Sequence, residues 1–504
     1  MMKKIGFDNE RYLKEQSQAI LERIGRFEGR LYLEFGGKLL YDYHAARVLP
    51  GYDPNIKIKL LKQLKDKIDI LLCIYAGDIE KGRIRGDFGI TYDVDARKLI
   101  DDLRGHSLEI LAVVITRFDN QPQAIRFKNI LENRNIKVYL HSATKGYPTD
   151  VDTIVSEEGY GKNTYIETKN PIIVITGPGP GSGKLATCLS QLYHDYRRGL
   201  KSGYAKFETF PIWNLPLKHP VNLAYEAATA DIADFNLIDP FHLSACNQSA
   251  VNYNRDVEIF PVLKRILEKI TGGELIYRSP TEMGVSRAGF AIVDDEVVKE
   301  AATQEIIRRY FRYNYENVLG IEKKETVDKI KLVMEEIKVK PEDRNAVEPA
   351  RTAASQPRNK NIVPEISCGA AIELKDGKII TGKNSVLMSS ASALILNAIK
   401  QLADIPDRIH LLSPKIIEHI KALKKDILGL KQEILDLEET LICLSMSSAT
   451  NPTAELAMEK LRELEGCEVH LTHIPSPGDE AGLRRLRVNL TTDANFPSGD
   501  LFLE

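Results

Sequence analysis

The sequence predicts an α/β protein with a parallel-sheet N-terminal domain, a mainly helical middle domain and a C-terminal α/β domain. Up to about residue 205, short apolar runs alternate with helical patterns, as is typical of βαβ units. From there to about residue 330 the periodicity is helical, with little strand pattern. A segment rich in charge, Pro, Ala and Ser then precedes a hairpin pattern. We expect domains at 1–205, 206–337 and 365–504, with a linker at 338–364.

Five apolar runs in the first part predict the buried strands of a parallel sheet. Helix-like segments such as "PQAIRFKNILENR" separate several of them. In such a sheet, ligands bind in the crevice outside the carboxyl ends of the strands. Residues that directly follow the runs are therefore candidates for a site. The runs are "RLYLEF", "DILLCIYA", "LEILAVVIT", "IKVYLH" and "PIIVIT".

Composition limits the classes of function. The chain has 504 residues, is 43% hydrophobic and carries a formal net charge of -2, which argues against sequence-independent binding of nucleic acid. No run approaches the roughly 18 apolar residues of a membrane span, and the N-terminus lacks the apolar core of a signal peptide. The six cysteines form no Cys-x-x-Cys pair, which indicates reduced thiols. We expect a cytoplasmic protein, and we predict no metal ligands.

The strand "PIIVIT" runs into a glycine-rich turn and then a helical pattern, which predicts a phosphate-binding loop. Free backbone N–H groups and the positive end of a helix dipole meet at such a turn. Glycines allow the backbone to approach a ligand closely, and a lysine adds positive charge. Pro178 and Pro180 each remove one donor. The predicted phosphate-binding residues are Gly177, Gly179, Gly181, Ser182, Gly183, Lys184 and Thr187.

The loop departs from the P-loop pattern G-x-x-x-x-G-K-[ST]. Its first glycine position holds Pro178, and the position of the magnesium-binding hydroxyl holds Leu185. Thr187 lies almost one helical turn later and could replace that hydroxyl only with altered geometry. Two alternatives stay open: a site for phosphate or a nucleotide with Mg²⁺, and a tight turn with an incidental lysine.

Cationic residues follow four other predicted strands, so a convergent cationic crevice is expected. The alternative for each residue is a solvated surface charge. His44 and Asp42 are the acid/base candidates because they follow the first strand, and Asp87 is a further candidate. The other crevice candidates of this part are Gly36, Gly37, Lys38, Arg47, Arg83, Arg85, Arg117 and Lys145.

Two polar and aromatic segments of the predicted middle domain could cover the crevice. Asn, Arg and Asp between aromatic residues often line a polar pocket, although helix capping and hydrogen bonds between domains explain them equally well. The candidates are Asn214, Lys218 and His219 in the first segment, and Asn252, Asn254, Arg255 and Asp256 in the second.

The C-terminal part begins with a hairpin pattern around Asp376-Gly377, followed by a helix at "SSASALILNAIKQLA". A long helix is expected next, because apolar residues recur at alternating spacings of four and three, as in a heptad seam. This seam predicts either packing on its own domain or an oligomer contact. It consists of Ile416, Ile420, Leu423, Ile427, Leu430, Ile434, Leu437 and Leu441.

The chain resembles an uncharacterised bacterial family, the family of domain of unknown function 1846. The resemblance rests on "DYHAARVLPGYDP", "KGYPTDVD", "GPGPGSGKLATCLSQLYH", "FPIWNLPLKHPVNLAYEAATAD" and "VNYNRDVEIFP", and it extends over essentially the whole chain. It implies a Rossmann-like domain, a helical domain and a C-terminal α/β domain, and no established activity.

The C-terminal part also resembles, more weakly, the cytidine-deaminase-like fold in "AIELKDGKIITGKNS" and the helix after it. Deaminases place zinc ligands and a catalytic Glu near that helix. Here the helix begins with Ser389 and Ser390, and Cys368, Cys443 and Cys467 are scattered. The resemblance therefore implies a metal-free domain.

Together these features predict a protein that binds a phosphorylated small molecule or a nucleotide. The leading hypothesis is an enzyme that performs group transfer on this ligand. A second is a nucleotide- or anion-responsive binding protein without catalysis. A third is a structural assembly protein, in which the heptad seam joins copies into a homo-oligomer and the glycine loop is only a turn.

Overall fold

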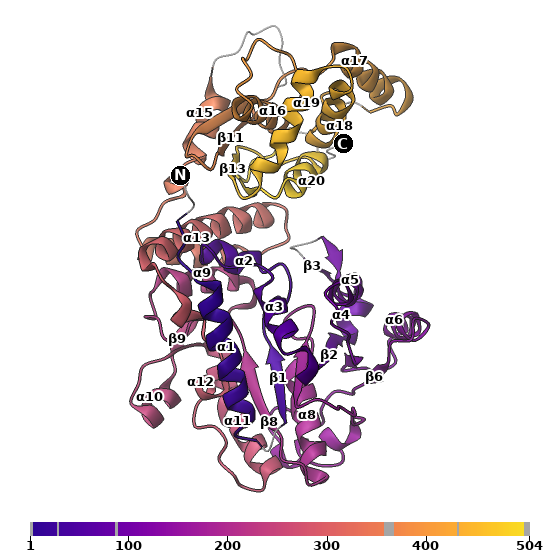
Figure 1. Cartoon of the computed structure of the whole chain (residues 1–504), viewed down its shortest axis with the longest axis vertical. Coiled ribbons are helices and arrows are strands. Elements are labelled where there is room, and N and C mark those ends of the chain that lie inside the picture. Colours follow the sequence, from indigo (N-terminus) through magenta and orange to yellow (C-terminus); the bar gives the residue numbers. More distant parts are fainter. Residues whose placement is uncertain (1–3, 28–29, 86–88, 357–366, 431–432, 498–504) are drawn as a thin grey trace. The chain divides into compact units, whose positions relative to one another are not determined.

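The computed structural model describes residues 4–27, 30–85, 89–356, 367–430 and 433–497 (Figure 1). The chain divides into two compact units, residues 4–302 and residues from 303 onward. Helices of the expected middle domain up to residue 302 therefore belong to the same unit as the parallel sheet. The predicted boundary after residue 205 does not separate two units.

A six-stranded parallel sheet forms the centre of the first unit, in the order β6-β5-β2-β7-β1-β8. All five predicted runs form strands of this sheet, because continuous runs of β-branched and other apolar residues suit a strand buried on both faces. The sixth strand, β8, is additional. The bounds are β1 Leu31–Phe35, β2 Ile68–Tyr75, β5 Ala112–Thr116, β6 Val138–Leu140, β7 Ile172–Thr176 and β8 Gly203–Phe207.

Helices cover both faces of this sheet. On one face, α8 (Lys184–Arg197) and α11 (Asn254–Thr271) share a core with alternate residues of β2, β5 and β7. On the other face, α5 (Tyr92–Gly105) and α6 (Pro122–Glu132) pack against the intervening residues of β2 and β5. The remaining elements of the unit are α1 Asn9–Ile24, α2 Tyr43–Val48, α3 Ile56–Gln63, α4 Ala76–Glu80, β3 Ile84–Arg85, β4 Ile90–Thr91, α7 Val151–Ile154, α9 Pro220–Ala228, β9 Asn236–Ile238, α10 Pro240–Cys246, β10 Val251–Tyr253 and α12 Pro280–Met283.

The order of the strands creates a switch point between β2 and β7. The chain that leaves β2 continues through α5 to β5, on one side. The chain that leaves β7 continues through α8 to β8, past β1 on the other side. Because the two connections diverge to opposite faces, a crevice opens at the carboxyl ends of β2 and β7, where open parallel sheets bind ligands. The glycine loop lies at this point.

The second unit contains a four-stranded mixed sheet in the order β12-β11-β13-β14, in which only β13 and β14 pair in parallel. Helices α16, α18, α19 and α20 enclose the main core of this unit, and α15 packs on β11. The bounds are α14 Lys324–Glu336, α15 Val347–Ser355, β11 Gly369–Glu373, β12 Ile379–Lys383, α16 Ser390–Leu402, α17 Pro414–Ala422, α18 Leu437–Ser448, α19 Pro452–Glu459, β13 Glu468–Leu471, α20 Pro477–Arg485 and β14 Asn489–Thr492; α13 Asp295–Val318 leads into the unit.

The segment 338–364, predicted to be a linker, is folded over much of its length. It contains a 3₁₀ turn at Pro341–Asp343 and the whole of α15. Gly369 allows α15 to lie directly on β11, because a Cβ at this position would come within 2.2 Å of the Ala350 carbonyl oxygen. The linker prediction is therefore wrong for residues 341–355, and residues 357–364 lie outside the described residues.

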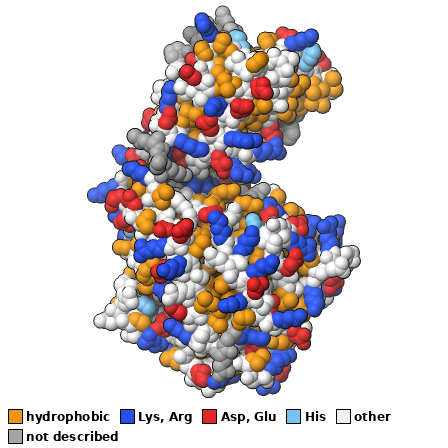
Figure 2. Space-filling view, in the orientation of Figure 1, with side chains coloured by type: hydrophobic (Ala, Val, Ile, Leu, Met, Phe, Trp, Pro, Cys, Tyr) orange, Lys and Arg blue, Asp and Glu red, His pale blue; other side chains and the backbone are white. Residues whose placement is uncertain are grey.

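The long heptad helix is also a wrong prediction. Helix α17 ends at Ala422, a π-helical turn covers Leu423–Ile427, and Gly429 takes a left-handed φ of 67°. A new helix, α18, starts after Asp436, whose side chain caps it together with Glu439. The side chains at the end of the π-helical turn are exposed, and Figure 2 shows apolar atoms gathered at the α17 end of this unit.

The N-termini of three helices in the second unit meet at one buried carboxylate. Asp479, in the first turn of α20, is 2% exposed. Its Oδ1 accepts hydrogen bonds from the Ser389 hydroxyl at the start of α16 (2.7 Å) and from the Leu437 N–H at the start of α18 (2.9 Å). Burial raises the pKa of Asp479 to about 6, although these donors act in the opposite direction. This contact fixes the three helices against one another.

Two expectations about the whole chain can be compared with the structure. Over the described ranges, none of the helices combines the length and the apolar character that crossing a membrane requires. All six cysteines are free, and five of them are buried. The cysteines are thus unpaired and mostly buried in this structure.

Replacement of Asp479 by Ala should loosen the second unit. The change leaves the Leu437 N–H buried without an acceptor and leaves the Ser389 hydroxyl only the Ser392 hydroxyl oxygen as an acceptor, at a cost of about 3 kcal/mol. Amide hydrogen exchange of α16 and α18 measures the effect, and faster exchange in both helices is expected. The exposed residue Asp407 gives the control variant Asp407→Ala. Equal protection in the two variants would contradict the role given to Asp479.

Candidate anion-binding site

The loop between β7 and α8 presents a row of unpaired backbone donors. Gly181 and Gly183 take left-handed φ angles of 74° and 91°. Among the described residues, the N–H groups of Gly181, Ser182, Gly183 and Lys184 donate no hydrogen bond. These donors stand at the N-terminus of the 14-residue helix α8, where the helix dipole favours an anion.

Thr116, at the end of β5, holds this loop in place. Its hydroxyl lies 2.8 Å from the Ser182 carbonyl oxygen and 3.3 Å from the Ile74 carbonyl oxygen, and it donates to them. A Cβ on Gly183 would come within 2.6 Å of the Thr116 side chain. Glycine is therefore required at 183 both by its φ and by the close approach of Thr116.

Two cations lie against the loop. The Lys184 ammonium is 3.4 Å from the Gly179 carbonyl oxygen and 3.4 Å from the Ser182 hydroxyl. Arg117 donates from Nη2 to the Gly181 carbonyl oxygen, and its guanidinium carbon lies 3.4 Å from the centre of the Tyr75 ring. Both cations bind loop carbonyls and hydroxyls, which leaves the N–H groups available. The loop thus combines unpaired donors with two positive charges.

Thr187 does not belong to this loop site. Its side chain is fully buried, and its hydroxyl accepts a hydrogen bond from the Cys73 thiol at 3.4 Å. The prediction that Thr187 contacts phosphate is wrong, because its position on α8 turns it toward the sheet. Residue 185 is leucine, so neither position supplies the hydroxyl that binds magnesium in a P-loop. The residues present do not fit a magnesium site of that kind.

At the end of β1, a buried ion pair organises the predicted acid/base residues. Asp42 caps α2 and pairs with the Lys57 ammonium at 2.9 Å. Lys57 is 1% exposed and also donates to the Lys38 carbonyl oxygen at 3.0 Å. Burial opposes the charge of Asp42, but Lys57 outweighs it and holds the pKa of Asp42 below its usual value. Asp42 is therefore a structural anion and a weak base.

Lys57 is a residue that sequence reasoning missed. It lies between Ile56 and Ile58 on α3, where a lysine would normally be taken as solvated. His44, the second acid/base candidate, packs edge-on against the Phe210 ring at a centroid distance of 5.3 Å. Arg47 is half-buried on α2.

The ends of β1 and β7 meet at a small cavity of about 30 Å³. Lys38 lines it from the β1 side, and Thr176 and Gly177 line it from the β7 side. The glycine turn after β1 and the glycine loop after β7 are therefore neighbours, as predicted from the parallel order of the strands.

A second charged cluster lies at the end of β8. The Lys206 ammonium is 2.7 Å from Asp256 and 3.3 Å from Glu208, and it also binds the Tyr253 hydroxyl. A Cβ on Gly36 would collide with the Glu208 side chain, so the cluster adjoins the turn after β1. Sequence reasoning found Gly36 and Asp256 but missed Lys206 and Glu208, because β8 was not predicted.

Glu208 is the residue at this edge that is best suited to proton transfer. Burial raises its pKa to about 7, with Lys206 acting against the rise and the carboxylates of Asp256 and Glu34 adding to it. Its side chain is 25% exposed. A carboxyl group that titrates near neutral pH and is still accessible can donate and accept protons under physiological conditions.

The other candidates from the second part of the unit have structural roles. Arg255 pairs through two nitrogens with Asp234, the Asn254 side chain accepts from the Phe235 N–H at 3.0 Å, and His219 caps α9 and contacts Asp295 at 3.0 Å. Asn252 is buried in β10. Asn214 and Lys218 are exposed in the segment before α9. Arg255, Asn254 and His219 therefore fit the alternative of capping and local hydrogen bonding.

The remaining cationic candidates make no printed contact with the glycine loop, the side chain of Arg85 is not described, and Asp87 lies outside the described residues. Arg83 is exposed and pairs with Asp78 at 3.4 Å. Lys145 is 65% exposed and pairs with Glu158. Arg85 is in β3. Among the described side chains, Arg117 contacts the glycine loop directly, and Lys38 lines the cavity that Gly177 also borders.

Replacement of Gly183 by Ala should destabilise the first unit by about 3 kcal/mol, since left-handed strain adds to the clash with Thr116. Gly199→Ala is the matched control: Gly199 has a φ of 75°, but a Cβ there meets nothing within 4 Å. The Gly199→Ala variant should lose only about 1 kcal/mol of the free energy of unfolding. Denaturant unfolding measures both, and equal losses would show that Thr116 does not constrain the loop.

The Glu208→Gln variant should gain stability over the native chain as pH rises. The folded state raises the pKa of Glu208 from 4.5 to about 7, so its favourable contribution is complete below pH 4.5 and is lost as pH rises through 7. Between pH 5 and 9 the variant should gain up to about 3 kcal/mol relative to the native chain.

Melting temperatures across this pH range measure the effect. The exposed residue Glu109 provides the control variant Glu109→Gln. A stability difference that stays constant with pH would rule out the raised pKa of Glu208.

Comparison with known proteins places the chain among relatives without an assigned activity. Residues 5–338 match the family model described as domain of unknown function DUF1846, N-terminal, and residues 342–502 match its C-terminal counterpart. A UPF0371 protein of Clostridium botulinum (strain Langeland) is 60% identical over 499 residues, 99% of both chains. A UPF0371 protein of Clostridium tetani is 58% identical over the same share. The chain therefore belongs to the DUF1846 family.

Proposed function

We propose that the protein binds a phosphorylated small molecule at the loop of residues 177–184. The observation that carries the proposal is the row of four consecutive N–H groups, 181 to 184, without acceptors among the described residues. Unpaired backbone donors are costly unless a ligand or water satisfies them, and phosphate oxygens are well matched to such a row.

Charge around the loop supports an anionic ligand. Lys184 and Arg117 lie directly against the loop. The adjoining cavity contributes no excess charge, because Asp95 and Asp102 line it together with Lys38 and Lys98. Charge-assisted hydrogen bonds from ammonium and guanidinium groups are shorter and stronger than neutral ones. A nucleotide is one member of the proposed ligand class, in a mode that does not rely on a magnesium-binding hydroxyl from the loop.

The proposed reaction type is group transfer, with Glu208 as the acid/base residue. Glu208 lies at the same edge of the sheet, beside Gly36, and its pKa near 7 suits proton transfer. A Rossmann-like relationship of the sheet is part of this proposal, and the switch point between β2 and β7 supports it. A cytoplasmic location is supported by the free cysteines.

The second candidate function is a phosphate-responsive binding protein without catalysis. Leu185 in place of the magnesium-binding hydroxyl favours it. For the second unit we retain a deaminase-like fold without zinc as a proposal, supported by the β11–β12 hairpin that precedes α16. Self-association is also part of the proposal. Exposed apolar residues after α17 support it, whereas the predicted heptad seam does not form.

The Lys184→Ala variant should bind phosphorylated ligands about tenfold or more weakly than the native chain, because one charge-assisted contact is lost. Thermal shift and calorimetric titration with inorganic phosphate, pyrophosphate, glucose 6-phosphate and ATP measure binding, each with and without Mg²⁺. At least one of these ligands should raise the melting temperature of the native chain.

Lys67 provides the matched control variant Lys67→Ala, because it is exposed at the amino end of β2, opposite the proposed site. This variant should bind as the native chain does. No stabilisation by any phosphorylated ligand, or an equal loss in both variants, would overturn the proposal. Binding without turnover of any ligand would favour the non-catalytic function.

A further inference from the structure

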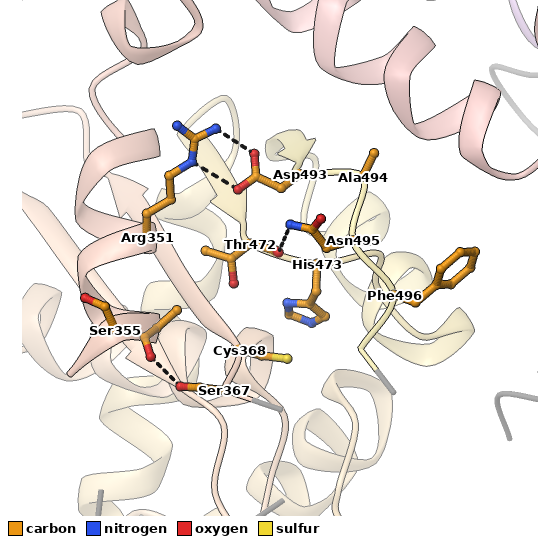
Figure 3. Close-up of a pocket in the computed structure, with 11 residues that line it drawn as sticks. Arg351, Ser355, Ser367, Cys368, Thr472, His473, Asp493, Ala494, Asn495 and Phe496 are labelled. Atoms are coloured by element: carbon orange, nitrogen blue, oxygen red, sulfur yellow. Dashed lines mark hydrogen bonds and ion pairs between the residues drawn. The ribbon is translucent and has the colours of Figure 1, made fainter. Parts of the chain in front are cut away.

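The two cations at the glycine loop have no carboxylate partner. Among the described residues, neither Lys184 nor Arg117 forms an ion pair, and each side chain donates only to oxygen atoms of the loop. By contrast, Arg351, which lines a cavity of the second unit, binds both carboxylate oxygens of Asp493 at 3.1 and 2.8 Å (Figure 3). The loop therefore holds two positive charges that the protein does not neutralise.

Other lysines at the carboxyl edge of the same sheet are paired with carboxylates. Lys57 lies 2.9 Å from Asp42 near the end of β1, and Lys206 lies 2.7 Å from Asp256 at the end of β8. The lack of a carboxylate beside the glycine loop is therefore a local feature of the loop and not a property of the whole edge.

Arg117 is held over the ring of Tyr75. Its guanidinium carbon lies 3.4 Å from the ring centre, and its Nη2 donates to the Gly181 carbonyl oxygen. Gly77 makes room for the ring, since a Cβ at this position would come within 2.4 Å of it. A guanidinium has five N–H donors, and among the described residues the other four of Arg117 make no hydrogen bond. These donors are fixed beside the first free amide of the loop.

The loop differs from a P-loop in how it can balance the charge of a ligand. In a P-loop, backbone amides and a lysine hold neighbouring phosphate groups, and the hydroxyl directly after the lysine binds magnesium. Here Leu185 occupies that position, and the Thr187 hydroxyl is buried against the Cys73 thiol. The additional positive charge beside the amides comes instead from Arg117, whose planar fork of donors matches phosphate oxygens.

We propose that the loop binds a diphosphate group without magnesium, with one phosphate on the amides of residues 181–184 and the next on the guanidinium of Arg117. This proposal rests on the proposed function and names the ligand class of the same site. The N–H of Gly181 and the carbonyl oxygen that Arg117 binds belong to one residue, so the two phosphate positions are neighbours. Lys184 and Arg117 provide one positive charge for each phosphate group.

Calorimetric titration of the full chain in the presence of EDTA tests this proposal with two pairs of ligands: inorganic phosphate with pyrophosphate, and AMP with ADP. In each pair the diphosphate should bind at least about tenfold more tightly, because the second phosphate gains charge-assisted hydrogen bonds from Arg117. An excess of Mg²⁺ in place of EDTA should not tighten the binding of pyrophosphate or ADP.

The Arg117→Gln variant should reduce the preference for the diphosphate to about threefold or less. Arg117→Lys keeps the charge but loses the planar fork, so its preference should be intermediate, and it keeps the test decisive if Arg117→Gln does not fold. Arg117 is exposed, so both changes leave the core intact. The control is Arg134→Gln, at an exposed position before the amino end of β6, and it should keep the native preference.

The possible outcomes separate this proposal from the proposed function. If none of the four ligands binds, the proposed function fails and the diphosphate proposal fails with it. If phosphate binds but pyrophosphate binds no more tightly, only the diphosphate proposal is overturned. Tighter binding of pyrophosphate with Mg²⁺ than with EDTA, or the native preference in both Arg117 variants, would overturn it in the same way.

Discussion

The contact of the Thr116 hydroxyl with the glycine loop is the constraint on which the candidate site depends. From the end of β5 it reaches the carbonyl oxygens of Ile74 in β2 and Ser182 in the loop, and so joins three neighbouring strand ends. The same side chain excludes any Cβ at Gly183. The chain can then enter α8 only through a left-handed residue, and the amides around it stay without partners.

The carboxyl edge of the sheet changes its chemical character between β7 and β8, which β1 separates. Around β5 and β7 it offers amide donors, Lys184 and Arg117. Around β8 it offers carboxylates, among them Glu208, whose pKa burial raises to about 7 with a further contribution from the neighbouring carboxylates. This separation is what our proposal requires: the region at β5 and β7 holds the phosphate of a ligand by electrostatic attraction, and the region at β8 exchanges protons with the part of the ligand that reacts.

Local patterns in the sequence predicted the parallel sheet and the glycine loop, because apolar runs and glycine spacing do not depend on distant residues. Strand β8 was not predicted because Lys206 interrupts its apolar run. The role of Lys206 depends on a carboxylate far along the chain, that of Asp256. Lys57 was not predicted as a site residue for a related reason. Its ammonium group is buried on α3 because it pairs with Asp42, and the sequence does not show that contact. The prediction of a long heptad helix was wrong because it used the apolar periodicity alone and did not consider that Gly429 could take a left-handed φ and end the helix. The assignment of Thr187 to the phosphate site was wrong because its distance from Lys184 along the sequence does not show which face of α8 it occupies.

The most direct test of the account is amide spectroscopy of the loop itself. Protein labelled with ¹⁵N-glycine reports on Gly181 and Gly183 separately from most of the chain, and titration with inorganic phosphate should shift both signals in a saturable manner. Gly199, at the far end of α8, serves as an internal reference that should not move. Unchanged Gly181 and Gly183 signals at saturating phosphate, or shifts confined to glycines elsewhere, would contradict the claim that these amides receive an anion.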